Sequence, residues 1–162
     1  MRWIATCGRG LEELVERELG ELGVEVRSRE SGGVAFDGSF ADGLRANWRL
    51  RTANRVLVEL ASWPAADNDQ LYAGARALVE NAPDAYLKRD GGATLPLAEL
   101  FSPDRTFSIQ ATSSHSEIRD TRWIAMKVKD GIVDAQRERF NARSDIERSS
   151  PDVALRLRLF RD

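Results

Sequence analysis

The fold is decided by residues 106–140, which read TFSIQATSSHSEIRDTRWIAMKVKDGIVDAQRERF. Residues 106–112 alternate between polar and apolar, residues 113–120 are mostly polar, and apolar residues then recur at helical spacing. This order predicts a strand, a hydroxyl-rich loop and a long helix. A helix N-terminus carries free N–H groups and a partial positive charge, and Arg119 and Arg122 flank this one. The stretch therefore predicts a phosphate-binding site.

The end of the chain alternates again. Over residues 153–159, Arg156 and Arg158 share one face and apolar side chains share the other. Such alternation is typical of a half-exposed antiparallel strand. We therefore predict that residues 153–159 pair in the antiparallel direction.

The segment before residue 106 predicts a helix and several short pieces. Asp67 is expected to cap a helix that stops before Pro83, with an apolar face that includes Leu71 and Val79. Asp90-Gly91-Gly92 predicts a turn. A short apolar segment follows from Pro96 to Ser102.

The first 62 residues predict two helices between four strands. The expected order is a strand at 3–6, a helix from Leu11 to Gly20 or Gly23, strands at 24–27 and 34–36, a helix near 40–48 and a strand at 55–61. This is the order of a ferredoxin-like split βαβ unit. Gly8-Arg9-Gly10 is interpreted as a tight turn between strand and helix, because it is only a fragment of a nucleotide-binding glycine loop.

The second predicted helix begins after one of two candidate caps. Ser39 and Asp37 both have side chains that accept hydrogen bonds from the first helical turn. The helical spacing of Phe40, Leu44 and Trp48 predicts that these three side chains lie on the inner face.

Length and composition bound the class of protein. With 162 residues, 42% of them apolar and 31% charged, the chain fits one globular domain or two small packed subdomains. It has no apolar run long enough for a membrane span and no signal-peptide pattern. The chain has a single cysteine, Cys7, which cannot form an internal disulfide and offers no metal-ligand spacing, so we expect no metal. A lone cysteine at the end of a strand is more often a small buried residue. A chain without disulfides agrees with a reducing compartment, so we expect a cytoplasmic location.

The charges are unevenly distributed, although the net charge is only −2. Four arginines and no acid lie between Arg45 and Arg55, and eight Lys or Arg residues against five acids lie between Arg105 and Arg143. Local patches of this kind decide whether a chain binds nucleic acid. The alternative is an ordinary solvated surface, in which Arg45 and Arg49 pair with acids of the first helix.

Several motifs in this order carry a resemblance. They are IATCGRGLEEL at 4–14, GGVAF at 32–36, RTANRV at 51–56, LYAG at 71–74, IRDTR at 118–122 and AMKVKDGIVD at 125–134. The chain resembles the ferredoxin-like and THUMP region of bacterial S-adenosylmethionine-dependent RNA guanine-N2 methyltransferases, and the ribosomal RNA branch in particular. Members of this family are often labelled N6-adenine-specific DNA methylases. The resemblance covers nearly the whole chain.

The resemblance implies an α+β fold with mixed or antiparallel sheets and packed helices. A ferredoxin-like subdomain would occupy residues 1–64 and a THUMP domain residues 65–162. It also implies that the THUMP half holds structured RNA, an rRNA stem or a tRNA, for a following domain that uses S-adenosylmethionine. The sequence contains neither a Gly-rich cofactor loop nor an Asn-Pro-Pro-Tyr-type motif, so we expect no cofactor and no catalytic residue in this chain, which would be a piece of a larger methyltransferase.

The candidate RNA contacts are basic and hydroxyl-bearing side chains. They are Arg119, Arg122, Lys127, Lys129, Ser113, Ser114, Arg49 and Arg51. Arginine binds phosphate through two parallel hydrogen bonds, and seryl hydroxyls complete such a shell. Trp123 is open to two interpretations: packing in the core, which is the more common role of such a residue, and stacking on an unpaired base.

Three functional hypotheses remain at this stage. The first is an RNA-binding module that serves a methyltransferase domain outside the chain. The second is a complete small enzyme with an unrecognised active site, which would require a concave cluster of acids with perturbed pKa values or a nucleotide pocket. The third is a protein-interaction or dimerisation adaptor without nucleic acid.

Overall fold

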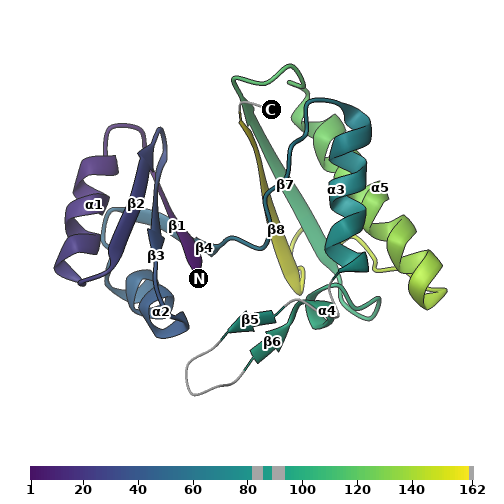
Figure 1. Ribbon diagram of the computed structural model, residues 1–162, viewed down its shortest axis with the longest axis horizontal. Coiled ribbons are helices and arrows are strands. Elements are labelled where there is room, and N and C mark those ends of the chain that lie inside the picture. The colour runs from purple at the N-terminus through teal and green to yellow at the C-terminus, as the bar shows by residue number, and fades with distance from the viewer. Residues whose placement is uncertain (82–85, 89–93, 161–162) are drawn as a thin grey trace. The chain divides into compact units, whose positions relative to one another are not determined.

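The computed structural model describes residues 1–81, 86–88 and 94–160, so the turn predicted at residues 90–92 lies outside the described part. The chain divides into two compact units, Met1–Ser62 with Leu87–Leu95, and Trp63–Tyr86 with Pro96–Asp162. The strands β5 (Tyr86–Lys88) and β6 (Thr94–Pro96) form a two-stranded sheet of their own (Figure 1).

The first unit is a four-stranded sheet with two helices. Its elements are β1 (Arg2–Cys7), α1 (Glu12–Glu21), β2 (Glu25–Glu30), β3 (Gly33–Asp37), α2 (Phe40–Arg49) and β4 (Ala53–Val58). The strand order is β2-β3-β1-β4, and every neighbouring pair is antiparallel. The predicted ferredoxin-like order of strands and helices is therefore confirmed.

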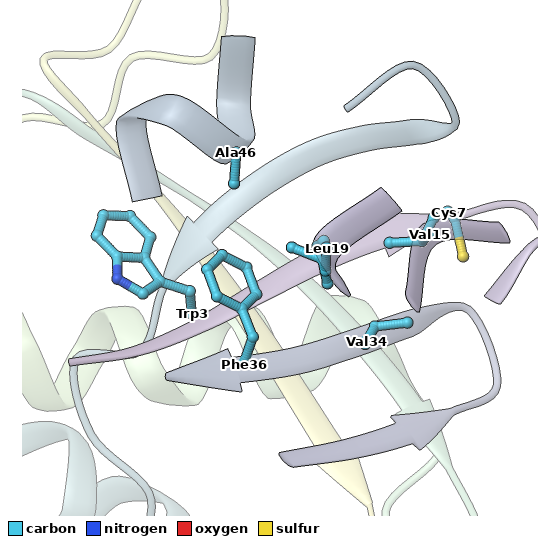
Figure 2. Packing of buried hydrophobic residues seen from close by; sticks show 8 residues of the cluster. Trp3, Cys7, Val15, Leu19, Val34, Phe36 and Ala46 are labelled. Carbon is cyan, nitrogen blue, oxygen red and sulfur yellow. The ribbon is translucent and has the colours of Figure 1, made fainter. Parts of the chain in front are cut away.

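The core of this unit lies between one face of the sheet and both helices (Figure 2). Alternate residues of β1, namely Trp3, Ala5 and Cys7, meet Val15 and Leu19 of α1 and Ala46 of α2. The expectation of a buried Cys7 is confirmed, and burial raises the pKa of its thiol. A neutral, buried thiol of this kind behaves as a small apolar side chain.

The turn between β1 and α1 is held by a side chain. The Glu12 carboxylate accepts hydrogen bonds from Gly10 N at 2.7 Å and from Gly32 N at 2.8 Å. Gly10 has φ +88°, a conformation that favours glycine. The glycines of this segment therefore shape a turn, as predicted, and the Glu12 carboxylate holds that turn to the β2–β3 hairpin.

Helix α2 is rotated relative to the sequence-based prediction. Phe40 packs against the core as expected, but Leu44 is 54% exposed and Trp48 is 89% exposed. The buried side is formed instead by Gly43 and Ala46, because the Trp3 ring lies directly on Gly43 and a Cβ there would come within 2.2 Å of Trp3 Cζ2. The prediction of an inner Leu44 and Trp48 is therefore wrong.

The start of α2 decides between the two candidate caps. Ser39 is the cap: its hydroxyl accepts from Asp42 N at 3.1 Å, and the Asp42 carboxylate accepts from Ser39 N at 2.8 Å. Such a capping box satisfies two of the free N–H groups at a helix start. Asp37 belongs to β3 and pairs with Arg27.

Glu18 of α1 anchors the segment that links α2 to β4. Its buried carboxylate accepts hydrogen bonds from Arg51 N at 3.0 Å, Thr52 N at 3.3 Å and Thr52 Oγ1 at 3.0 Å. Burial alone raises the pKa of Glu18, but the hydrogen bonds from Arg51 and Thr52 outweigh it, so the pKa lies below its ordinary value.

We expect Glu18→Gln to lower the free energy of unfolding at neutral pH and to flatten its acid dependence. Because the folded-state pKa is lowered, the carboxylate stabilises the fold above the ordinary glutamate pKa of about 4.3 and this contribution is lost as pH falls through the folded value. Urea unfolding at several pH values measures the difference. Glu13→Gln, on an exposed position of the same helix, is the control. A variant difference that grows toward low pH would contradict the prediction.

The second unit contains two paired strands and three helices, two of which pack against each other. Its elements are α3 (Asn68–Glu80), α4 (Leu97–Leu100), β7 (Phe107–Ser114), α5 (Thr121–Phe140) and β8 (Val153–Phe160). Asp67 caps α3 by accepting from Gln70 N at 2.8 Å, as predicted. The predicted mixture of helices and sheets is confirmed for this unit as well.

The pairing direction of β8 corrects the prediction for residues 153–159. β8 runs parallel to β7, with Phe107 opposite Val153 and Ser114 opposite Phe160. The predicted faces are right, since Arg156 and Arg158 are exposed and Leu159 is buried. Alternation of polar and apolar residues indicates only that one face of the strand is covered. The direction is parallel because α5 connects β7 to β8 as a crossover helix, which a parallel pair requires.

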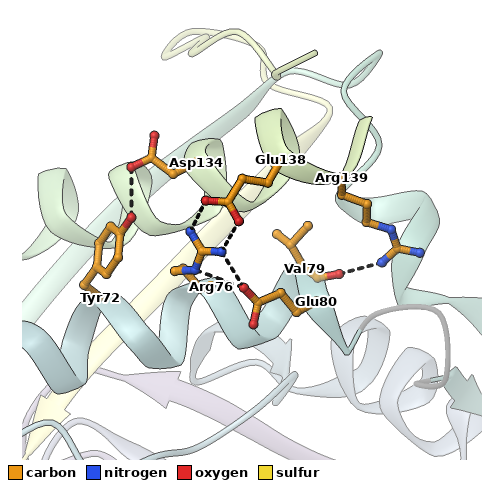
Figure 3. A network of polar contacts seen from close by, with 7 residues as sticks. All are labelled: Tyr72, Arg76, Val79, Glu80, Asp134, Glu138 and Arg139. Carbon is orange, nitrogen blue, oxygen red and sulfur yellow. Dashed lines mark hydrogen bonds and ion pairs between the residues drawn. The ribbon is translucent and has the colours of Figure 1, made fainter. Parts of the chain in front are cut away.

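Helices α3 and α5 pack closely and are joined by polar contacts (Figure 3). Arg76 of α3 lies between Glu80 and Glu138, and its Nη1 donates to Glu138 Oε1 at 3.0 Å. Tyr72 Oη donates to Asp134 Oδ2 at 2.9 Å. Close approach is possible because α5 carries Gly131, where a Cβ would lie 2.7 Å from Tyr72 O.

A buried amide ties α5 to the loop that leads to β8. Gln136 is fully buried and its Nε2 donates to Phe101 O and to Ser144 Oγ, both at 2.8 Å. Its Oε1 accepts from Ser144 N at 3.0 Å. The loop between α5 and β8 is therefore fixed to the helix by a satisfied polar network.

Candidate nucleic-acid interface

The N-terminus of α5 is capped by a carboxylate of the chain itself. Asp120 is the N-cap, and its Oδ1 accepts from Arg122 N at 2.9 Å and from Trp123 N at 3.2 Å. These two N–H groups are therefore not free for a phosphate, contrary to the simple picture of an open helix end. The side chains of Arg119 and Arg122 remain exposed, so a phosphate contact here would depend on their guanidinium groups.

The loop before α5 is internally bonded. Ser113 Oγ donates to Ile118 O at 2.6 Å, and the buried Ser116 hydroxyl accepts from Ile118 N at 3.1 Å. His115 takes the left-handed conformation, with φ 55°. Its ring is perpendicular to that of Phe160, with the two ring centroids 5.6 Å apart. These contacts give the loop a defined shape at the end of β7.

A surface depression of about 370 Å³ lies in this loop. It is lined by Ser113, Ser114, His115, Ser116, Glu117 and Arg119. The structure therefore brings three of the predicted contacts, Ser113, Ser114 and Arg119, to one place. The Ser113 hydroxyl already donates to the backbone, which leaves its oxygen only as an acceptor, while Ser114 is exposed.

The exposed surface of α5 continues from its first turn. Arg122, Met126 and Lys129 follow one another at i, i+4 and i+7 and so share a stripe of the helix. Lys129 Nζ lies 2.6 Å from Asp130 Oδ1, so part of its charge is compensated within the helix. Arg122 is exposed and makes no ion pair with a described residue.

Trp123 lies at the surface and not in the core, where such a residue is more commonly found. It is 41% exposed, and its Nε1 donates to Asn68 Oδ1 of α3 at 3.0 Å. Lys127 Nζ lies 5.1 Å from the ring centroid, within the range of a cation–π contact. Asn68 therefore fixes the orientation of the indole, a role that could not be predicted from the sequence.

In the first unit, Arg49 and Arg51 follow Trp48. Arg49 is exposed, and 80% of the Arg51 side chain is exposed although its Nε lies 3.3 Å from Glu18 Oε1. Arg45 forms an ion pair with Asp42 of its own helix and donates to Leu22 O at 3.2 Å. The alternative that Arg45 and Arg49 pair with acids of the first helix is therefore wrong for the described residues, and the arginine that pairs with such an acid is Arg51.

Comparison with protein families identifies both units. The family model of the RlmL ferredoxin-like domain matches residues 2–57, and that of the THUMP domain matches residues 90–162. The chain carries an RlmL ferredoxin-like domain followed by a THUMP domain. The resemblance to a ferredoxin-like and THUMP region is therefore confirmed.

Curated relatives align with the full length of the chain. The chain is 32% identical over 162 residues to a ribosomal RNA large subunit methyltransferase K/L of Psychromonas ingrahamii, covering 100% of the chain and 19% of the relative. It is 33% identical over 162 residues to the protein of the same name from Syntrophotalea carbinolica, covering 100% of the chain and 20% of the relative. The chain thus spans about a fifth of these proteins.

Solved structures share the fold. A predicted N6-adenine-specific DNA methylase from Listeria monocytogenes matches 99% of the chain and 38% of its own length, with a TM-score of 0.74 and 23% identity. TrmN from Thermus thermophilus matches 98% of the chain and 42% of its own length, with a TM-score of 0.60 and 21% identity. At these identities the likeness concerns the fold alone.

The two domains therefore present different groups. The THUMP domain offers the end of β7 with the loop that follows it and the exposed stripe of α5, where hydroxyl groups and guanidinium groups lie close together. Ser113 and Ser114 are the last two residues of β7, so the loop predicted from residue 113 begins after Ser114. The ferredoxin-like domain offers Arg49 and Arg51 beside an exposed tryptophan. In the described part of the chain, no helix is long and apolar enough to cross a membrane.

Proposed function

We propose that this chain is the RNA-binding region of an S-adenosylmethionine-dependent RNA guanine-N2 methyltransferase. It would hold structured RNA, in the first place an rRNA stem, for a methyltransferase domain in the same polypeptide. The observation that carries the proposal is the THUMP domain, found behind an RlmL ferredoxin-like domain in proteins named as large-subunit rRNA methyltransferases. The proposed site of action is the cytoplasm, and S-adenosylmethionine would bind in the methyltransferase domain.

The geometry of the THUMP domain supports this role. Arg119 lies at the serine-lined depression and Arg122 in the first turn of α5, and both are exposed. Guanidinium groups bind phosphate in a bidentate manner, and an exposed serine such as Ser114 can add a hydrogen bond. In this proposal Lys127 and Lys129 contribute weaker, more screened attraction, because one contacts Trp123 and the other pairs with Asp130.

The experiment is a filter-binding titration of the whole chain with an rRNA stem-loop, with tRNA as a second ligand. We expect wild-type affinity to fall steeply between low and moderate salt, because bound phosphates release counterions. The double variant Arg119→Glu and Arg122→Glu is expected to bind at least about tenfold more weakly at low salt, since two phosphate contacts become repulsive.

A matched control separates local contacts from net charge. The double variant Arg143→Glu and Arg148→Glu makes the same change in net charge at two exposed residues of the loop between α5 and β8. It is expected to change the affinity by less than about threefold. Salt-independent binding, or equal losses in both sets of variants, would contradict the proposed site.

A further inference from the structure

The outer face of α2 in the ferredoxin-like domain exposes two large apolar side chains. Trp48 is 89% exposed and Leu44 is 54% exposed, and their i, i+4 spacing places them on one side of the helix. The opposite side is filled by Gly43 and Ala46, which fit under the sheet residue Trp3. Trp48 therefore makes little contribution to the core, and its indole is presented to a ligand.

The charges around Trp48 indicate what kind of ligand fits. Between Gly43 and Val58 there is no acidic residue, and Arg45, Arg49 and Arg51 lie within three residues of the ring in sequence. Arg49 makes no ion pair with a described residue, and Arg51 keeps an 80% exposed side chain. Of the three arginines, Arg45 pairs with Asp42 and Arg51 pairs with Glu18, so Arg49 supplies the positive charge that no described acid compensates. An exposed aromatic ring beside Arg49 and the largely exposed Arg51 complements a nucleic acid, whose bases stack and whose phosphates are negative.

We propose that Trp48 is a stacking platform for an unpaired base of the bound RNA, with Arg49 and Arg51 contacting the phosphates beside that base. This rests on the proposed function and extends it to the kind of RNA: a stem with a single-stranded nucleotide, in place of a uniform duplex. A duplex keeps its bases stacked on one another, whereas an unpaired base is free to stack on an indole.

The test compares two RNAs with the same number of phosphates, a blunt duplex and a stem-loop with a single-stranded tail. For Trp48→Ala, we expect about tenfold weaker binding of the tailed RNA and less than about twofold change for the duplex, because stacking on an aromatic residue depends on an accessible base face. Trp48→Phe, which keeps a ring, is expected to restore most of the affinity. Since Trp48 is 89% exposed, both variants should unfold at the wild-type urea concentration.

The outcomes separate this inference from the proposed function. If wild type binds neither RNA, the proposed function fails. If wild type binds both and Trp48→Ala binds the tailed RNA as tightly as wild type does, only the stacking inference is overturned. Equal losses for duplex and tailed RNA would also overturn the stacking inference. A third contrary outcome is a wild-type dimer in sedimentation that Trp48→Ala dissociates without changing the RNA affinity. That result would make this face a protein interface.

Discussion

Replacing Gly131 with alanine is expected to lower the free energy of unfolding of the THUMP domain by about 2–3 kcal/mol. A Cβ at this position would lie 2.7 Å from Tyr72 O and 2.8 Å from Ala75 Cβ. The oxygen belongs to the backbone of α3 and cannot turn away, so the two helices have to separate. Separation also strains the contacts of Tyr72 with Asp134 and of Arg76 with Glu138 (Figure 3).

Urea unfolding followed by circular dichroism measures this effect, with Gly20→Ala as the matched control. Gly20 lies in α1 with nothing within 4 Å of its would-be Cβ, so alanine is expected to stabilise that helix by roughly 0.5–1 kcal/mol. Opposite signs for the same chemical change would show that α3–α5 contact, and not helix propensity, decides the result at Gly131. A neutral or stabilising Gly131→Ala would mean that the helices do not pack this closely.

Replacing Gln136 with leucine is expected to destabilise the THUMP domain by about 3 kcal/mol. The amide is fully buried and makes three hydrogen bonds, to Phe101 O, Ser144 Oγ and Ser144 N. Leucine has a similar volume but removes the partners of Phe101 O and Ser144 N, while Ser144 Oγ keeps its hydrogen bond to Ser102 O. Each lost partner carries a desolvation cost. The loop that leads to β8 would lose its attachment to α5.

Thermal and urea unfolding measure the loss at Gln136, and Gln110→Leu is the control. Gln110 lies on the exposed face of β7, so the same substitution there is expected to change the free energy of unfolding by less than about 0.5 kcal/mol. Hydrogen exchange should show faster exchange of Ser144 N in Gln136→Leu. An unchanged exchange rate there would indicate that the loop is held by other contacts.

The sequence predicted the elements of secondary structure well because their patterns are local. The long helix was expected from Thr121 to Phe140 and is observed at those residues, since its apolar stripe of Ile124, Val128 and Ile132 sets the face that is buried. The ferredoxin-like order followed from short alternating runs separated by glycine turns. The direction of β8 did not follow, because a period of two is the same in parallel and antiparallel pairs.

The candidate site was predicted in part. The resemblance and the charge distribution indicated Arg119 and Arg122, and the structure brings Arg119 together with the serines of the preceding loop. The Asp120 cap has a local signature, because an aspartate directly before the first helical residue is a typical N-cap. The orientation of Trp123 has none, because it depends on Asn68 of α3, 55 residues away in sequence.

The sequence by itself determined which segments are helices and strands, which two domain families they belong to, and where basic residues are concentrated. Only the tertiary structure decided which face of α2 is buried, and hence that Trp48 is exposed. The physical reason is the Trp3 ring of β1, which leaves no room for a side chain at Gly43, while Ala46 lies in the same core. The helical spacing of apolar residues indicates which side of a helix is hydrophobic, whereas the side that is buried depends on the shape of the surface against which the helix packs.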